Sequence, residues 1–284
     1  MAVPELISVV ITTYNRSDAL VAVLSALTRQ SDRRFEVIVA DDGSIQAHRD
    51  YLLQSAPARA LKLVHIWHPD IGFTASKVRN RGVAAAQGNY IVFLDGDCVP
   101  ENDFIARHRT LAAPGFFVNG SRVLLSAGLT QRVSDGLENV DGHGFGYWMR
   151  KRLAGDANKL TGLVRLPDFS GRNQARFTWK GIRSCNLAVW RPDFEKVDGF
   201  DESFVGWGHE DADFVLRLHN LGIVRKSGFC ATEVYHLWHP EASRQRESAN
   251  AQTVRQRATT QIVKPTLGYA RLRVDDDAVL TRAG

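Results

Sequence analysis

Residues Tyr90–Asp97, YIVFLDGD, join a short hydrophobic segment to an acidic turn. The five residues Tyr90–Leu94 have the character of a strand that is buried on both faces of a sheet. The next three residues place two carboxylates on either side of a glycine. Mg²⁺ and Mn²⁺ accept such oxygen ligands and commonly keep substrate phosphates in their coordination shells. Taken alone, the triplet fits a solvated Asp-Gly turn equally well.

Strands and helices alternate around this segment. Hydrophobic runs predict strands at 6–12, 35–40 and 61–67, and helically spaced hydrophobic residues predict helices at 18–27 and 74–86. Ser17 is well placed to cap the first helix. Because each strand–helix pair takes about 30 residues, the pattern predicts an α/β fold with a mostly parallel central sheet and helices on both faces.

Polar clusters follow three of the predicted strands, at 13–16, 41–44 and 95–97. Ligands of open parallel sheets bind outside the carboxyl ends of the strands, so we expect these clusters to line one pocket. No GxGxxG follows the first strand, which argues against a Rossmann dinucleotide site, and no P-loop motif occurs.

The second half of the chain has weaker periodic signals. We expect a strand at 184–190, a helix at 210–221 and a final strand at 230–235. Frequent glycines predict long loops within 129–180. Residues beyond 242 are expected to form a polar, partly helical tail.

An acidic cluster opens the helix expected at 210–221. Adjacent acids at a helix start often serve only as partners of the helix dipole. Here Gly206-Trp207-Gly208 precedes Glu210 and Asp211, which gives tight turns and an aromatic surface suited to a sugar ring. A carboxylate in such a pocket can take a proton from an attacking hydroxyl.

Two histidines, His236 and His239, follow the last predicted strand. Histidines at this spacing are usually structural, and they become metal-ligand candidates only if the fold brings them to Asp97.

These segments together resemble the inverting GT-A glycosyltransferases of family 2. The matching motifs are VVITTYNR at 9–16, VADDGS at 39–44, RNRG at 79–82 and FLDGD at 93–97. A second region resembles the C-terminal segment of galactosyltransferases, through NLA at 186–188, VDGFDE at 197–202 and GWGHED at 206–211. Each motif is weak by itself, whereas the ordered set is specific.

The resemblance implies a role for each matching residue. Nucleotide-sugar binding would fall to Thr13, Tyr14, Asp41, Asp42, Arg79, Asp95 and Gly96. Asp97 would bind Mn²⁺ or Mg²⁺, with His239 and His236 completing the metal site. Asp211 would be the catalytic base, with Glu210 beside it. Trp207 and Gly208 would bind the acceptor.

The resemblance also implies an organisation and a reaction. A single catalytic domain would span 1–240, with a nucleotide-sugar-binding half at 1–125, an acceptor and catalytic half at 126–240, and a tail at 241–284. The enzyme would move a hexose from a nucleotide sugar, with UDP preferred, to a hydroxyl of a glycan or glycolipid in bacterial surface polysaccharide or lipopolysaccharide synthesis. A nucleotidyltransferase and a nucleotide-sugar or glycan-binding module without catalysis remain the alternatives.

Charge and composition bear on the binding partners and the cellular location of the protein. The chain has 36 Lys and Arg against 31 Asp and Glu, and residues 150–191 hold ten basic residues against two acidic ones. This segment is either a solvated surface or a wall that faces an anionic acceptor or membrane surface. No nucleic-acid-binding module accompanies the charge. Three dispersed cysteines, no signal-like N-terminus and no membrane-length apolar run predict a cytoplasmic protein, with peripheral contact at the inner face of the membrane left open.

Overall fold

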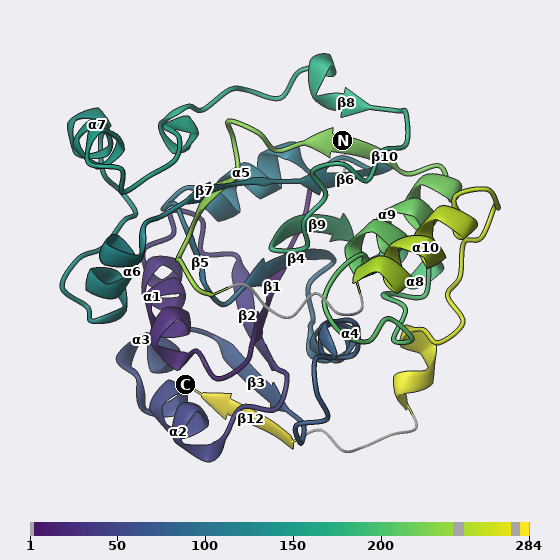
Figure 1. Ribbon diagram of the computed structural model, residues 1–284, viewed down its shortest axis with the longest axis horizontal. Helices are drawn as coiled ribbons and strands as arrows, with labels where there is room; N and C mark the ends of the chain where they lie inside the picture. The colour runs from purple at the N-terminus through teal and green to yellow at the C-terminus, as the bar shows by residue number, and fades with distance from the viewer. Residues whose placement is uncertain (1–2, 241–246, 274–278, 284) are drawn as a thin grey trace.

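The computed structural model describes residues 3–240, 247–273 and 279–283, in which helices and strands alternate (Figure 1). The helices are α1 Ser17–Thr28, α2 Gln46–Gln54, α3 Ala56–Ala60, α4 Ala75–Ala85, α5 Phe104–Leu111, α6 Ala127–Ser134, α7 Phe145–Leu153, α8 Arg191–Lys196, α9 Glu210–Asn220 and α10 Glu247–Arg257. The strands are β1 Ile7–Thr13, β2 Phe35–Asp41, β3 Leu63–Trp67, β4 Tyr90–Asp95, β5 Cys98–Pro100, β6 Phe116–Asn119, β7 Ser121–Leu124, β8 Asn173–Gln174, β9 Asn186–Trp190, β10 Val224–Ser227, β11 Glu233–His236 and β12 Val279–Ala283.

The main sheet has nine strands in the order β12-β3-β2-β1-β4-β9-β6-β10-β8. Its centre, β3-β2-β1-β4, is parallel, as the sequence predicts. The register pairs Thr13 with Asp41 and Thr12 with Asp95, so the polar clusters after these strands meet at one edge. The predicted strand at 184–190 is β9, which runs antiparallel to β4.

Strands from the two halves of the chain interleave in this sheet. β9 lies between β4 and β6, and β10 lies on the other side of β6. Both strands that flank β6 therefore come from residues much later in the chain, and the two halves of the chain share one sheet.

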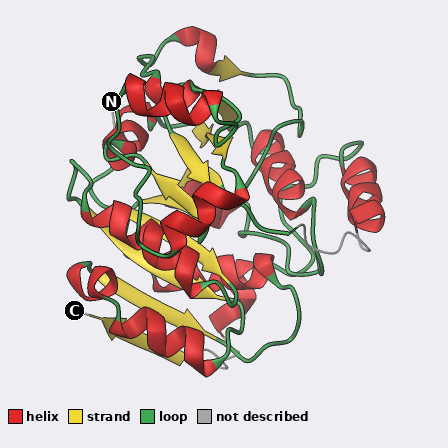
Figure 2. Ribbon diagram, turned by 60° about the vertical axis from the view of Figure 1, so that its left-hand side comes forward, coloured by secondary structure: helices red, strands yellow, loops and turns green. Residues whose placement is uncertain are grey.

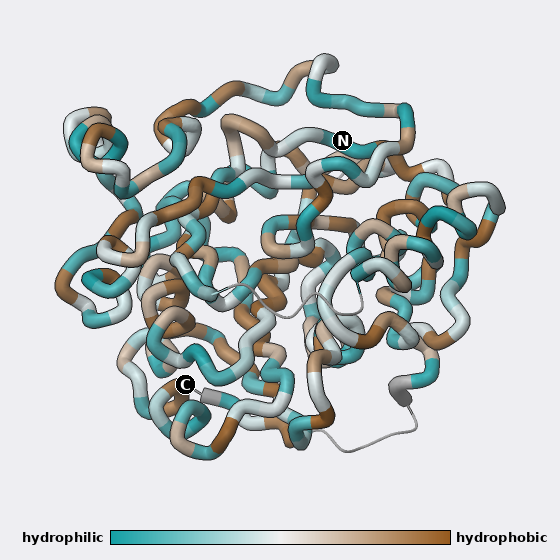
Figure 3. Tube along the Cα trace, in the orientation of Figure 1, coloured by the Kyte–Doolittle hydropathy of each residue, from teal (hydrophilic) through white to brown (hydrophobic). Residues whose placement is uncertain are grey.

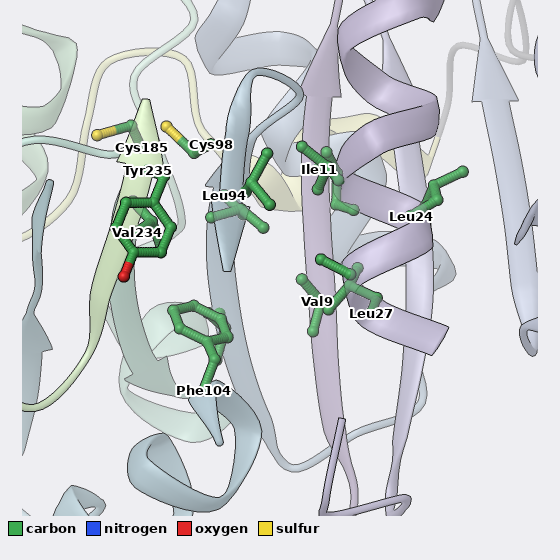
Figure 4. Close-up of a cluster of buried hydrophobic side chains, with 14 of the residues drawn as sticks. Val9, Ile11, Leu24, Leu27, Leu94, Cys98, Phe104, Cys185, Val234 and Tyr235 are labelled. Atoms are coloured by element: carbon green, nitrogen blue, oxygen red, sulfur yellow. The ribbon is translucent and has the colours of Figure 1, made fainter. Parts of the chain in front are cut away.

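The sheet is buried on both faces because successive side chains of a strand point to opposite sides. In β1, Val9 and Ile11 pack with Leu24 and Leu27 of α1, whereas Val10 packs on the other face against α4. Figure 4 shows the first of these clusters. Figure 2 shows helices covering the sheet, and Figure 3 shows hydrophobic segments in the interior and hydrophilic residues around β8.

A second, three-stranded sheet has the order β5-β11-β7. The strand that we expected at 230–235 as the final one is β11, Glu233–His236, and it belongs to this small sheet. The expectation was wrong in two respects, because β12 follows it and because Cys230 has a φ of 54°, which ends regular strand geometry there.

Two local features differ from the sequence predictions. Ser17 does not cap α1: it is the first helical residue, and its Oγ lies 2.8 Å from Nδ1 of His48. Part of the expected tail lies against the body, since β12 pairs with β3 and α10 packs on α9. The region 129–180 contains most of α6, all of α7, two short 3-10 helices and the two-residue strand β8, joined by long connections.

The described helices include none that is both long and apolar enough to cross a membrane.

Candidate active site

The end of β2 places two aspartates with different surroundings. Asp41 is 1% exposed, and its carboxylate accepts hydrogen bonds from Ser44 N (2.8 Å) and contacts Nε2 of His65 (3.0 Å). Asp42 accepts from the backbone N of Thr74 (2.8 Å) and from its hydroxyl, and lies 3.2 Å from Nε2 of His68. Asp41 therefore fixes the loop after β2, whereas Asp42 joins this loop to the start of α4.

Tyr14 stands at the open side of the same loop. Its side chain is 49% exposed, and its hydroxyl donates to Asp70 at 2.8 Å. Gly43 lets the two loops approach, because its φ is 101° and a Cβ there would lie 2.5 Å from Cα of Asp70. Thr13 and Tyr14 thus border a partly exposed polar surface at the end of β1.

Arg79 of α4 links two acidic groups at the sheet edge. Its Nη1 donates to Oε1 of Glu210 at 3.0 Å, and its Nη2 lies 3.4 Å from Oδ1 of Asp95. The hydroxyl of Thr12 also donates to Asp95, at 2.9 Å. Gly96 allows the chain to turn directly after Asp95, and its N donates to Thr12 O at 2.8 Å. The arrangement ties the end of β4 to the start of α9.

The fold brings the carboxylate of Asp97 close to His236 and His239, which is the condition for these histidines to be metal-ligand candidates. Oδ2 of Asp97 lies 3.2 Å from Nε2 of His239, and Oδ1 lies 3.8 Å from Nε2 of His236. The pairing of β5 with β11 creates this proximity, because it sets Cys98 opposite His236 and lets Leu237 N donate to Asp97 O at 2.8 Å. A carboxylate and imidazole nitrogens are donors of the kind that suits a divalent cation.

Cys98 borders this group. Its thiol donates to Oδ1 of Asp97 at 3.5 Å, and its sulfur clusters with ligand atoms of Asp97 and His236 within 4.8 Å. Burial raises the pKa of this thiol well above its usual range. The neutral thiol leaves the carboxylate and the imidazoles as the donors for a hard cation.

Asp211 has the properties of a proton acceptor. Burial and then the neighbouring charge of Glu210 raise its pKa to about 7, although Arg79 acts in the opposite direction. Its oxygens accept from Ser184 N at 3.3 Å and from Ala212 N at 2.7 Å, which fixes its orientation. A carboxylate that titrates near neutral pH suits general base catalysis.

The turn before α9 is tightly coiled. Gly206, Gly208 and His209 all have positive φ, and His209 with φ 70° occupies the N-cap position of α9. A histidine in this region is strained, as is common at functional sites. Trp207 is half-buried in this turn, and the ring of Trp179 lies 6.5 Å from that of His209. Aromatic side chains therefore gather beside the two acids.

The basic segment 150–191 divides into two groups. Arg172 is buried and donates to four backbone carbonyls, so this arginine belongs neither to a solvated surface nor to a wall that faces an acceptor. By contrast, Arg176, Lys180 and Arg183 are exposed, and no salt bridge is found for them among the described residues. Arg183 precedes Ser184, whose N–H binds Asp211, so exposed positive charge lies next to the acids.

Sequence reasoning missed three contributors to the site. Thr74 and the backbone of Ser184 act through N–H groups that motifs do not reveal. Arg122 of β7 lies beside the small sheet, with Nη1 3.9 Å from Sγ of Cys185. Burial lowers the pKa of Arg122, but Cys185, Cys98, Asp95 and Asp97 raise it by more. No motif covers these residues, and only the tertiary pairing of strands brings them here.

Comparison with known families accounts for most of the chain. The model described as glycosyl transferase family 2 matches residues 8–169, which is more than half of the chain. The chain is a family 2 glycosyltransferase. Residues 169–240 match a second model, described as the N-terminal domain of galactosyltransferase. The enzyme's Asp95–Asp97 turn lies in the first match, and Asp211, His236 and His239 lie in the second.

Named relatives are glycosyltransferases. The enzyme is 31% identical over 226 residues to a validoxylamine A glucosyltransferase of Streptomyces hygroscopicus, which covers 77% of this chain and 52% of that relative. It is 26% identical over 279 residues to a chondroitin synthase of Escherichia coli, which covers 93% of this chain and 38% of that relative. The chain thus spans about half, or less, of the length of these relatives.

Solved structures confirm the GT-A fold. A mannosyltransferase of Pyrobaculum calidifontis, solved with GDP-Man and Mn²⁺, matches with a TM-score of 0.52 and 18% identity, over 92% of this chain and 63% of that one. TarS of S. aureus matches with a TM-score of 0.54 and 15% identity, over 94% of this chain and 41% of that one.

Proposed function

We propose that the enzyme is a metal-dependent inverting transferase that moves a hexose from a nucleotide sugar to a hydroxyl of a glycan or glycolipid. The observation that carries this proposal is that Arg79 contacts both Asp95 and Glu210. These contacts join two acidic groups: Asp97, with His236 and His239 beside it, and Asp211 with Glu210. Donor and acceptor would bind between these groups.

The donor would lie over the ends of β1, β2 and β4. Thr13, Tyr14 and Asp42 border the surface suited to the nucleoside, while Asp41 holds the loop beneath it. Arg79, Asp95 and Gly96 lie between this surface and the acids. We propose UDP as the nucleotide because residues 186–211 resemble the C-terminal segment of galactosyltransferases.

Asp97, His236 and His239 would hold Mn²⁺ or Mg²⁺, which supplies positive charge for the phosphates of the departing nucleoside diphosphate. The carboxylate of Asp97 lies 3.2 Å from Nε2 of His239 and 3.8 Å from Nε2 of His236, so both imidazoles are close to the proposed ligand.

Asp211 would take the proton of the attacking acceptor hydroxyl. The hydroxyl oxygen forms a bond to the anomeric carbon as the bond from that carbon to the diphosphate oxygen breaks. A single displacement of this kind inverts the anomeric configuration. Glu210, which is paired with Arg79, would contact donor or acceptor sugar at its edge.

The acceptor would enter beside Trp207 and Gly208. Exposed Arg176, Lys180 and Arg183 on the approach favour an anionic glycan or glycolipid, in keeping with bacterial surface polysaccharide or lipopolysaccharide synthesis. We place this reaction in the cytoplasm, with peripheral contact at the inner face of the membrane where the acceptor carries a lipid.

The proposal is tested by supplying UDP-, GDP- and dTDP-hexoses with Mn²⁺ and measuring release of nucleoside diphosphate. We expect metal-dependent release from one nucleotide class, stimulated by acceptor and absent from the Asp211→Asn variant. Nucleotide binding without transfer to any of several acceptors would instead favour a binding module.

A further inference from the structure

We propose that Arg122 binds the diphosphate of the nucleotide sugar and offsets the charge that develops on the leaving group. This inference rests on the proposed function and adds a residue to it. Arg122 lies outside every motif of the donor site, on β7 of the small sheet.

Strand pairing directs Arg122 toward the proposed metal site. In the register of the small sheet, Leu124 of β7 pairs with His236 of β11, and His236 pairs with Cys98 of β5. Directly paired residues share a face, and so do residues two apart on one strand. The side chain of Arg122 therefore leaves the sheet on the face that carries His236 and Cys98.

Contacts agree with this direction. Nη1 of Arg122 lies 3.9 Å from Sγ of Cys185, and the thiol of Cys98 is 3.5 Å from Asp97. In Figure 4 the sulfur atoms of Cys98 and Cys185 lie close together beside the end of β4. The guanidinium thus lies near the pair of thiols, one of which contacts Asp97.

The two arginines of this region differ in what balances their charge. Arg79 pairs with Glu210 at 3.0 Å and with Asp95 at 3.4 Å. In the described part of the chain, Arg122 has no carboxylate oxygen within the 4.0 Å salt-bridge distance. Arg122 therefore keeps its hydrogen-bonding capacity for an incoming anion, whereas much of that of Arg79 is already used.

A diphosphate is the anion that fits. The planar guanidinium donates paired hydrogen bonds that match phosphate oxygens. Arg122 is half-buried, so its attraction for an anion is screened less than that of a surface cation. Arg122 would meet the diphosphate from β7, whereas Arg79 lies on α4.

Isothermal titration calorimetry of Arg122→Met and Arg122→Lys tests this role. Binding of UDP and binding of uridine are each measured with Mn²⁺. GDP and dTDP, with their nucleosides, are measured in parallel. For Arg122→Met we expect roughly 10–100-fold weaker binding of the nucleoside diphosphate, with nucleoside binding unchanged. Arg122→Lys should recover part of the loss. Arg152→Met, at an exposed arginine of α7, is the matched control.

Comparison of diphosphate binding with nucleoside binding separates a direct contact of Arg122 with the diphosphate from a structural role of this side chain. Unchanged diphosphate binding in Arg122→Met overturns the proposal, and so does an equal loss for nucleoside and diphosphate. Should Arg122→Met fail to fold, the proposal rests on Arg122→Lys, which must weaken diphosphate binding selectively. A wild-type protein that binds none of the nucleoside diphosphates would refute the proposed function itself.

Discussion

The Asp95–Asp97 turn and the start of α9 each bring two acidic side chains to the same sheet edge, in different surroundings. Asp97 faces His236 and His239, groups that can share a cation with it. Asp211 faces the carboxylate of Glu210 and a backbone N–H, and its pKa is raised to about 7. The same functional group is thus suited to binding a cation in one region and to exchanging a proton in the other.

The largest expected effect comes from removing the proton acceptor. Asp211→Asn should lower kcat by roughly 10²–10⁴-fold, because the amide cannot accept the hydroxyl proton, while binding of UDP stays near that of the wild type. Initial rates and calorimetry measure the two quantities. Near-normal turnover in a folded Asp211→Asn protein would contradict the assignment.

The same variant should be more stable than the wild type at pH 8. Because folding raises the pKa of Asp211 from 3.8 to about 7, its contribution to stability is fully present below about pH 4 and is lost as the pH rises through 7. Asparagine carries no charge to bury, so Tm should rise by roughly 2 °C or more at pH 8 and change less at pH 5. Thermal unfolding at both pH values provides the measurement.

Substitution of Asp97 in the proposed metal site should change both the reaction rate and the binding of Mn²⁺. Asp97→Asn should lower the rate by about 10³-fold and weaken Mn²⁺ binding, because the neutral amide is a poorer ligand for a cation. Chelation by EDTA should produce a similar loss in the wild type, reversed by added Mn²⁺. Asp135→Asn, an exposed aspartate after α6, is the control. Full activity in EDTA would exclude the metal role.

A smaller effect should appear in the pH profile. In the role of base that we propose for Asp211, kcat/KM should fall about tenfold per pH unit below 7. Glu210→Gln removes one cause of the raised pKa, so the acidic limb should move to lower pH. The pH dependence of kcat/KM for both proteins tests this, and an unshifted limb would show that Glu210 does not set the pKa of Asp211.

The smallest effect concerns the acceptor approach. Lys180→Gln with Arg183→Gln should raise the KM for an anionic acceptor by roughly 3–10-fold and reduce its salt dependence, since exposed pairs each contribute about 1 kcal/mol or less. The KM for the donor should not change. Arg150→Gln with Arg152→Gln is the matched control, because α7 lies on the opposite side of the molecule from α9 (Figure 1). Equal effects in both pairs would indicate a general charge effect.

How well the sequence predicted the structure depended on the range of the interactions. The parallel centre and its acidic turns follow from contiguous hydrophobic strands that end in polar motifs, and these predictions were confirmed. The prediction that Ser17 caps α1 was wrong, because its hydroxyl instead contacts the ring of His48, 31 residues away. Arg122 was missed because its position depends on the pairing of β7 with β11, more than 100 residues later. Local patterns carry no information about such partners.

The interleaved sheet limits how this enzyme can be recombined with its relatives. The two family matches meet at residue 169, which invites exchange of everything beyond that point. Such a chimera would replace both neighbours of β6 at once, since β9 and β10 flank it. Asn80 adds a further dependence, because its side chain exchanges hydrogen bonds with the backbone of Phe200. Exchange of the loop at 176–183 alone should therefore disturb the sheet less than exchange of whole halves.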